Sequence, residues 1–121
     1  MTPEEVAATA TVRRWFASAA LEGAPEEEKL RRLVLLADFC RHSSQSPDEL
    51  VAGLLRTTKA GDTAISAKRR KAMNATIDQF VAVRGLDGKD AVITGNTLRS
   101  FLVHNGIFIQ GRAWRESSAS A

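Results

Sequence analysis

Four consecutive cations stand at the start of a predicted helix, in the run ISAKRRKAMNATIDQF that covers residues 65–80. They are Lys68, Arg69, Arg70 and Lys71. Aligned peptide dipoles give a helix N-terminus roughly half a positive charge, so each cation there costs about 0.3–1 kcal/mol. Successive side chains are rotated by about 100°, which spreads the four cations around the helix. Such a ring of cations can bind DNA phosphates that lie across the end of a helix.

A solvated helix start is the alternative interpretation, in which nearby acids offset the cations. Only one acid, Asp62, occurs between Arg56 and Asp78, so this offset is weak. Residues 1–50 carry six Lys and Arg against nine Asp and Glu, whereas residues 51–121 carry eleven against five. This imbalance fits either an uneven solvated surface or, as we favour, a partner rich in negative charge.

A second polar group opens the last predicted helix, in the run TGNTLRSFL. Short polar side chains and arginine are the types that contact phosphates and base edges. One or two of these residues must cap the helix, and Arg99 is the best DNA-binding candidate among them. With a lysine from the preceding loop, the predicted DNA-binding residues are Lys59, Lys68, Arg69, Arg70, Lys71, Asn96, Thr97 and Arg99.

The sequence shows no recognisable catalytic constellation. It has no serine–histidine–aspartate arrangement, no glycine-rich phosphate loop and no tyrosine. Cys40 is the only cysteine, which excludes an internal disulfide and a CxxC metal pair. His42 and His104 have no partners at metal-ligand spacing. We therefore expect a protein that is not an enzyme and that uses no cofactor or metal.

The hydrophobic pattern is helical almost throughout. Five helices are predicted: from Pro3 to about Leu21, from about Pro25, after an N-cap at Ser46, after an N-cap at Ser66, and after an N-cap at Thr94 or Asn96. Ser46, Pro47 and Glu49 are the clearest local signal, because they match a capping box with proline at the first helical position. Gly85 and the Asn-Gly pair at 105–106 are expected to end the last two helices.

Apolar residues at helical spacing predict the core. In the second helix they are Leu30, Leu33, Val34, Leu36, Ala37, Phe39 and Cys40. In the fourth and fifth helices they are Met73, Ile77, Phe80, Val81, Leu98, Phe101 and Leu102. The run TTKAGDTA is expected to be a polar loop, and IFI at 107–109 either a short strand or an extended apolar tail. The predicted fold is an all-α bundle of four or five helices.

A chain of 121 residues has room for one modest core. We expect one helical domain over residues 1–110 and a flexible tail over residues 111–121. No apolar run approaches the roughly 20 residues that a membrane-spanning helix needs. The start MTPEEVAATA lacks the layout of a signal peptide. A cytoplasmic protein without a membrane partner is therefore expected.

The run VRRWFASAALEGAPEEEKLRRLVLLADFCRHSSQSPDELVAGLLR resembles the N-terminal core-binding (SAM-like) domain of tyrosine recombinases, the phage integrases. It is most similar to the archaeal-type members. The shared features are a Val-Arg-Arg-Trp opening helix, a helix ending LADFCRHS, and SPDELV directly after it. Further on, IDQFVAVRG and TLRSFLVHNGIFI are similar to the family's third and fourth domain helices. The resemblance covers about residues 11–109 and depends on the order and spacing of these motifs.

The resemblance implies two crossed helical hairpins that form one half of a C-shaped clamp around a recombination site. It also implies that the fourth and fifth helices, and the loop before them, face DNA. The family's catalytic domain, with its Arg, Lys, His and nucleophilic Tyr, has no counterpart in this sequence. A chain without tyrosine cannot form the family's phosphotyrosyl intermediate. The segment TTKAGDTAISAKRRK also has fewer acidic and apolar residues than is usual there.

We therefore expect a non-catalytic module that binds double-stranded DNA through phosphates, with limited major-groove contacts, in site-specific recombination or DNA integration. A further expected partner is an integrase catalytic domain or another recombination protein. One alternative is a helical protein-interaction module that uses IFI and Trp114. Another is a small mobile-element regulator that acts on an integrase or on its sites.

Overall fold

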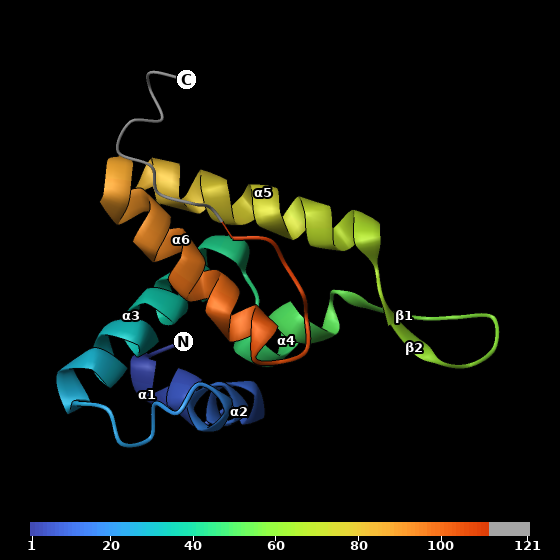
Figure 1. The fold of residues 1–121 in the computed structure, drawn as a ribbon, viewed down its shortest axis with the longest axis horizontal. Helices are drawn as coiled ribbons and strands as arrows, with labels where there is room; N and C mark the ends of the chain where they lie inside the picture. The colour runs from blue at the N-terminus through green and yellow to red at the C-terminus, as the bar shows by residue number, and fades with distance from the viewer. Residues whose placement is uncertain (112–121) are drawn as a thin grey trace.

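The computed structural model describes residues 1–111, which form six helices and one two-stranded antiparallel hairpin (Figure 1). The helices are α1 (Pro3–Ala7), α2 (Ala10–Ser18), α3 (Glu26–Ser43), α4 (Pro47–Ala52), α5 (Ala67–Val83) and α6 (Gly88–Val103), and the strands are β1 (Leu55–Thr57) and β2 (Thr63–Ile65). The predicted all-α class is confirmed. In Figure 1, α5 lies along one side of the molecule, and α6 runs diagonally from beside one end of α5 towards α4. The hairpin projects beyond the helices.

The first predicted helix is wrong in one respect, because the structure divides it into α1 and α2. The second of these helices begins against a side chain of α4. The backbone N–H and the hydroxyl of Thr11 both donate to Asp48 Oδ1, at 3.1 and 2.5 Å. The turn between the helices allows Val6 and Trp15 to be fully buried together. Asp48 is distant in the sequence, so no local pattern predicts this break.

The capping box at the start of α4 is confirmed. Ser46 Oγ accepts a hydrogen bond from the Glu49 N–H at 3.2 Å, and Glu49 Oε1 accepts one from the Ser46 N–H at 2.9 Å. Pro47 takes the first helical position, where its missing N–H costs nothing.

The predicted core face of α3 is partly wrong. Leu30 and Val34 are 52% and 40% exposed, whereas Leu35, which the pattern did not select, is buried. The buried predicted residues are Leu36, Ala37, Phe39 and Cys40. Because α3 packs on α1, α5 and α6, its core face is rotated away from Leu30 and Val34. These two residues line an open groove between α3 and α6.

The predicted polar loop TTKAGDTA belongs to a β-hairpin. The register pairs Leu55 with Ile65, Arg56 with Ala64, and Thr57 with Thr63. The tip is closed by Thr58, whose N–H donates to the Asp62 carbonyl at 2.7 Å and whose hydroxyl accepts from the Asp62 N–H at 3.1 Å. Gly61 takes a φ of +88° in this turn. Each strand has only three residues, too few for a period-two pattern to appear in the sequence.

The prediction for α5 is confirmed, whereas the predicted start of α6 is wrong. Met73, Ile77, Phe80 and Val81 are buried, and Ser66 caps the helix. The chain then turns at Gly85, which takes a φ of +73°. The next helix begins at Gly88, so Thr94 and Asn96 lie inside it and do not cap it. Asp87 occupies the N-cap position in an extended conformation.

Residues 107–111 follow α6 as an extended segment, which we call the strap. Gly106 turns the chain with a φ of +88°, and the Ile107 N–H donates to the Leu102 carbonyl at 2.9 Å. Ile107 and Ile109 are buried in the core, whereas Phe108 between them is 72% exposed. Of the two predictions for IFI, the extended apolar tail is therefore the confirmed one.

Apart from Gly111, the predicted flexible tail lies outside the described residues, and so does Trp114. Among the residues that the structure describes, no helix has the length and apolar character needed to cross a membrane.

Candidate nucleic-acid interface

The first turn of α5 carries the four consecutive cations, and a buried serine fixes where that turn begins. Ser66 Oγ accepts from the Arg69 N–H at 3.2 Å. The Ser66 N–H donates to the Leu54 carbonyl at 2.8 Å. The start of α5 is thus held against the segment that follows α4.

Two of the four cations bind backbone carbonyls of other segments. Arg69 Nη1 donates to the carbonyls of Gly53 and Leu55, at 3.4 and 3.2 Å. Arg70 Nη1 donates to the carbonyl of Phe108 at 3.3 Å. These carbonyl dipoles offset part of the unfavourable interaction between the cations and the positive helix end. A guanidinium has five N–H donors, so most of each fork stays available for a phosphate.

The other two cations, Lys68 and Lys71, are exposed. Neither makes a hydrogen bond or an ion pair within residues 1–111. Each therefore presents a solvated ammonium group that can exchange its hydration for an anion.

The hairpin adds two further cations. Lys59 lies at its tip and Arg56 on β1, and both side chains are exposed. The hairpin leads directly into α5, since β2 ends at Ile65 and the helix begins at Ala67. Figure 1 shows the hairpin projecting from the N-terminal end of α5. All six cations from Arg56 to Lys71 thus belong to one continuous projecting segment, which we call the basic segment.

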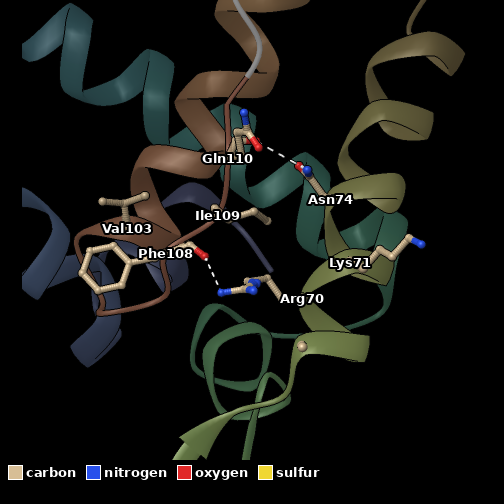
Figure 2. A pocket seen from close by; sticks show the side chains of 8 residues that line it. Arg70, Lys71, Asn74, Val103, Phe108, Ile109 and Gln110 are labelled. Carbon is tan, nitrogen blue, oxygen red and sulfur yellow. Dashed lines mark hydrogen bonds between the residues drawn. The ribbon is translucent and has the colours of Figure 1, made fainter.

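A groove of about 650 Å³ lies between the first half of α5 and the strap (Figure 2). Arg70, Lys71 and Asn74 line it from α5, and Phe108 and Gln110 line it from the strap. Asn74 Nδ2 donates to the Gln110 carbonyl at 3.4 Å, which ties the strap to α5. Cations, amides and an exposed aromatic ring are the groups with which proteins bind nucleic-acid strands.

Arg99, the best candidate in its predicted group, lies in the core and presents little surface to DNA. Its side chain is 3% exposed. Its guanidinium donates to Asn74 Oδ1 at 2.6 Å, Asp78 Oδ1 at 2.7 Å and Asn96 Oδ1 at 3.4 Å. The reason is the register of α6: because the helix begins at Gly88, Arg99 lies in its fourth turn and faces α5. This placement corrects the prediction that Arg99 contacts DNA, and gives it a structural role between α5 and α6.

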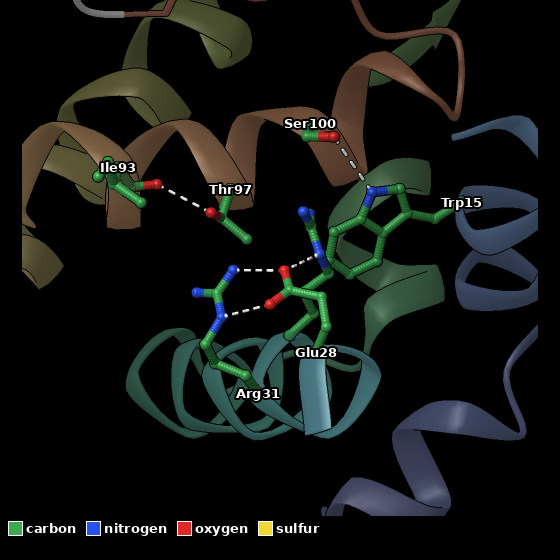
Figure 3. A network of polar contacts seen from close by, with 7 residues as sticks. Trp15, Glu28, Arg31, Ile93, Thr97 and Ser100 are labelled. Carbon is green, nitrogen blue, oxygen red and sulfur yellow. Dashed lines mark hydrogen bonds and ion pairs between the residues drawn. The ribbon is translucent and has the colours of Figure 1, made fainter. Parts of the chain in front are cut away.

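Asn96 and Thr97 are also placed in the packing of α6. Thr97 is 7% exposed, and its hydroxyl donates to the Ile93 carbonyl at 2.8 Å (Figure 3). Asn96 is half-buried and accepts a bond from Arg99. Because Thr97 is buried, the prediction that it contacts DNA is corrected. The prediction for Asn96, which is only partly buried, stays a prediction. Lys59, Lys68, Arg69, Arg70 and Lys71 keep their place in the candidate interface.

Many cations outside the basic segment are paired with acids. Arg31 and Arg32 both donate to Glu28, at 2.7 and 2.9 Å, and Figure 3 shows the pair of Arg31 with Glu28. The Arg32 guanidinium lies 5.9 Å from the centroid of the Trp15 ring. The hydrogen bond from Arg31, followed by that from Arg32, lowers the pKa of Glu28 to about 2. The other pairs are Lys29 with Glu26, Arg41 and Arg84 with Asp38, and Arg99 with Asp78. Within residues 1–111, no cation of the basic segment has an acidic partner.

Cys40 lies in the core, and the exposed His42 contacts two aromatic residues of the core. Burial raises the pKa of the Cys40 thiol to about 11. The His42 ring packs against Phe39 and Phe80, with centroids 6.3 and 5.2 Å apart. The described part of the chain holds no group of three or more His, Cys, Asp or Glu side chains placed to bind a metal ion.

Comparisons of the chain with family models, with curated proteins and with solved structures found no match. The resemblance to tyrosine recombinases therefore stays a prediction.

The groove of Figure 2 contains residues that no sequence motif selects. Asn74 and Gln110 are ordinary polar residues until the fold brings α5 and the strap together. The exposure of Phe108, in contrast, could have been predicted from the sequence. An extended chain alternates its side chains, so if Ile107 and Ile109 are buried the residue between them must point outward.

Proposed function

We propose that this chain is a non-catalytic DNA-binding module whose basic segment contacts the phosphates of duplex DNA. The observation that carries the proposal is the uneven pairing of charge. The cations without an acidic partner within residues 1–111 include all six of the basic segment: Arg56, Lys59, Lys68, Arg69, Arg70 and Lys71. Cations left unpaired on one projecting segment favour an external polyanion.

The binding mode follows from the groups available. Lysine ammonium groups and arginine forks neutralise phosphates and release the counterions condensed on DNA. Such contacts position a protein on a duplex and carry little sequence information. Because Asn96, Thr97 and Arg99 lie in the packing of α6, base readout by these residues is not part of the proposal.

The test is a titration of a labelled duplex at several salt concentrations. If about four to six phosphates are contacted, the logarithm of the affinity falls with the logarithm of salt with a slope of roughly −4 to −5. Absence of detectable binding at low salt contradicts the proposal. A slope near zero, together with measurable binding, also contradicts it, because phosphate neutralisation is then not the driving term.

The resemblance to the integrase core-binding domain supports a role in site-specific recombination or DNA integration. The sequence has no tyrosine, which is the residue that the family uses as its nucleophile. We therefore propose binding without strand cleavage, in the cytoplasm, beside an integrase catalytic domain or another recombination protein. Gel shifts with and without such an integrase distinguish a module that binds DNA alone from a regulator that needs the integrase.

A second candidate function is a helical protein-interaction module, which the open groove between α3 and α6 favours. Leu30, Val34 and Ile93 are 52%, 40% and 45% exposed along this groove. Under this alternative, Ile93→Asp abolishes function, whereas alanine substitutions in the basic segment leave it intact. An interaction through the IFI segment cannot be tested with Ile107→Asp, because Ile107 is buried in the core and the substitution would unfold the protein.

A further inference from the structure

The strap presents Phe108 as a fixed, solvent-facing aromatic ring. Its neighbours Ile107 and Ile109 are 1% and 8% exposed, and this alternation forces Phe108, at 72% exposed, to point outward. Its backbone is fixed as well, because its carbonyl accepts a hydrogen bond from Arg70 at 3.3 Å. The ring therefore cannot fold into the core without breaking the packing of both isoleucines.

The ring shares its groove with cations. Arg70 and Lys71 line the same groove of about 650 Å³ from α5 (Figure 2). Arg70 already reaches the strap, so its remaining N–H donors lie close to the backbone that carries the ring. Gln110 follows Phe108 by two residues along the strap and lines the same groove. A flat apolar ring, two cations and a glutamine thus line one open groove.

These groups match the parts of an unstacked nucleotide. A base stacks on an aromatic face with little regard to its identity, and its phosphate pairs with lysine or arginine. The bases of an intact duplex have their faces covered by neighbouring bases, so an unpaired or bulged base is the form that can reach the ring.

We propose that Phe108, Arg70 and Lys71 form a site for an unpaired DNA base, with the ring stacking on the base and the cations binding its phosphate. The proposal rests on the proposed DNA-binding function and deepens it. It assigns duplex phosphates to the basic segment as a whole and an extruded base to the groove beside the strap, where Arg70 and Lys71 belong to both.

The experiment uses the full chain and three labelled probes of one sequence. They are an intact duplex, the same duplex with one extra unpaired adenine at its centre, and the single strand. We expect the wild-type protein to bind the bulged duplex about tenfold more tightly than the intact duplex, as expected for one base–aromatic stack. Phe108→Ala and Phe108→Leu are each expected to remove this preference while changing the affinity for intact duplex by less than about twofold.

The leucine variant separates stacking from simple apolar contact, because it keeps an apolar side chain and loses the π face. Val83→Ala is the matched control, since Val83 is 66% exposed and lies roughly 20 Å from Arg70 along α5. This variant should keep the full preference for the bulge. Circular dichroism melting confirms that each variant is folded.

Three outcomes overturn the proposal. One is a wild-type protein that binds both duplexes equally. Another is a Phe108→Leu variant that keeps the preference. A third is a Phe108→Ala variant with unchanged affinity for every probe, which would show that the ring does not contact DNA. In all three the duplex is bound and the proposed function stands. If the wild-type protein binds none of the probes, the proposed function fails together with this inference.

Discussion

Arg99 Nη2 donates a hydrogen bond to Asp78 Oδ1 at 2.7 Å, which joins α6 to α5 through a salt bridge whose cation is buried. The two side chains differ in environment: that of Arg99 is 3% exposed and that of Asp78 is 46% exposed. The same guanidinium bonds to Asn74, which in turn donates to the Gln110 carbonyl of the strap. Through Asn74, Arg99 therefore helps to hold α5 and the strap together at the groove between them, although neither Arg99 nor Asp78 lines that groove.

We predict that Asp78→Ala lowers the free energy of unfolding by about 2–3 kcal/mol, because it leaves the Arg99 cation buried without its counter-charge. The expected loss is below the usual range for a fully buried pair, since Asp78 is partly solvated. Urea unfolding measures it. Gln79→Ala, at the neighbouring exposed position of α5, should change stability by less than about 0.5 kcal/mol. Equal stability of the two variants would show that the pair contributes nothing.

Much of the fold could be predicted from local sequence, because the signals that define it are local. Ser46 and Ser66 cap helices in the structure as their positions predict, since a cap involves only the next three residues. The core face of α5 follows from helical spacing alone. The basic segment could also be located from the sequence, because its six cations have only one acidic residue among them.

The wrong predictions concern features that depend on residues far apart in the sequence. At the start of α2, Thr11 is bound by Asp48 from another helix, a contact that no pattern within the first 21 residues contains. The polar group around Arg99 has the composition of a phosphate site, yet the same residue types satisfy a buried guanidinium once α6 begins at Gly88. Spacing along one helix cannot tell which side another helix will cover.

Glu28 should make the free energy of unfolding depend on pH in the acidic range. Its folded pKa is lowered to about 2 by Arg31 and Arg32, from an ordinary value of 4.5. A lowered carboxyl pKa stabilises the fold above the unfolded value and loses that effect as pH falls towards the folded value. We therefore expect wild type to be more stable than Glu28→Gln at about pH 6 and the two to converge near about pH 2.

Urea midpoints measured across this pH range provide the test for Glu28. Glu27→Gln is the control, since Glu27 is exposed and makes no hydrogen bond or ion pair within residues 1–111. A constant difference between wild type and Glu28→Gln at all pH values would refute the assignment.

The turn into the strap should depend on glycine for backbone reasons alone. Gly106 has a φ of +88°, and a Cβ there would meet no atom within 4 Å. Gly106→Ala is therefore expected to cost about 1–2 kcal/mol through its left-handed conformation. Gly23 has equally open surroundings and an ordinary φ, so Gly23→Ala should be neutral or slightly stabilising. Thermal melts of both variants make the comparison, and equal melting temperatures would contradict it.

The two lysines without partners should carry measurable phosphate contacts. Replacing both Lys68 and Lys71 with alanine is expected to weaken duplex binding and to make the salt slope shallower by about 2, or about 0.9 for each lost contact. Arg13→Ala with Arg41→Ala removes the same charge from exposed positions on α2 and α3, and should leave the slope unchanged. Fluorescence anisotropy at several salt concentrations provides the comparison. If both double variants lose the same slope, binding follows net charge, and the basic segment is not the interface.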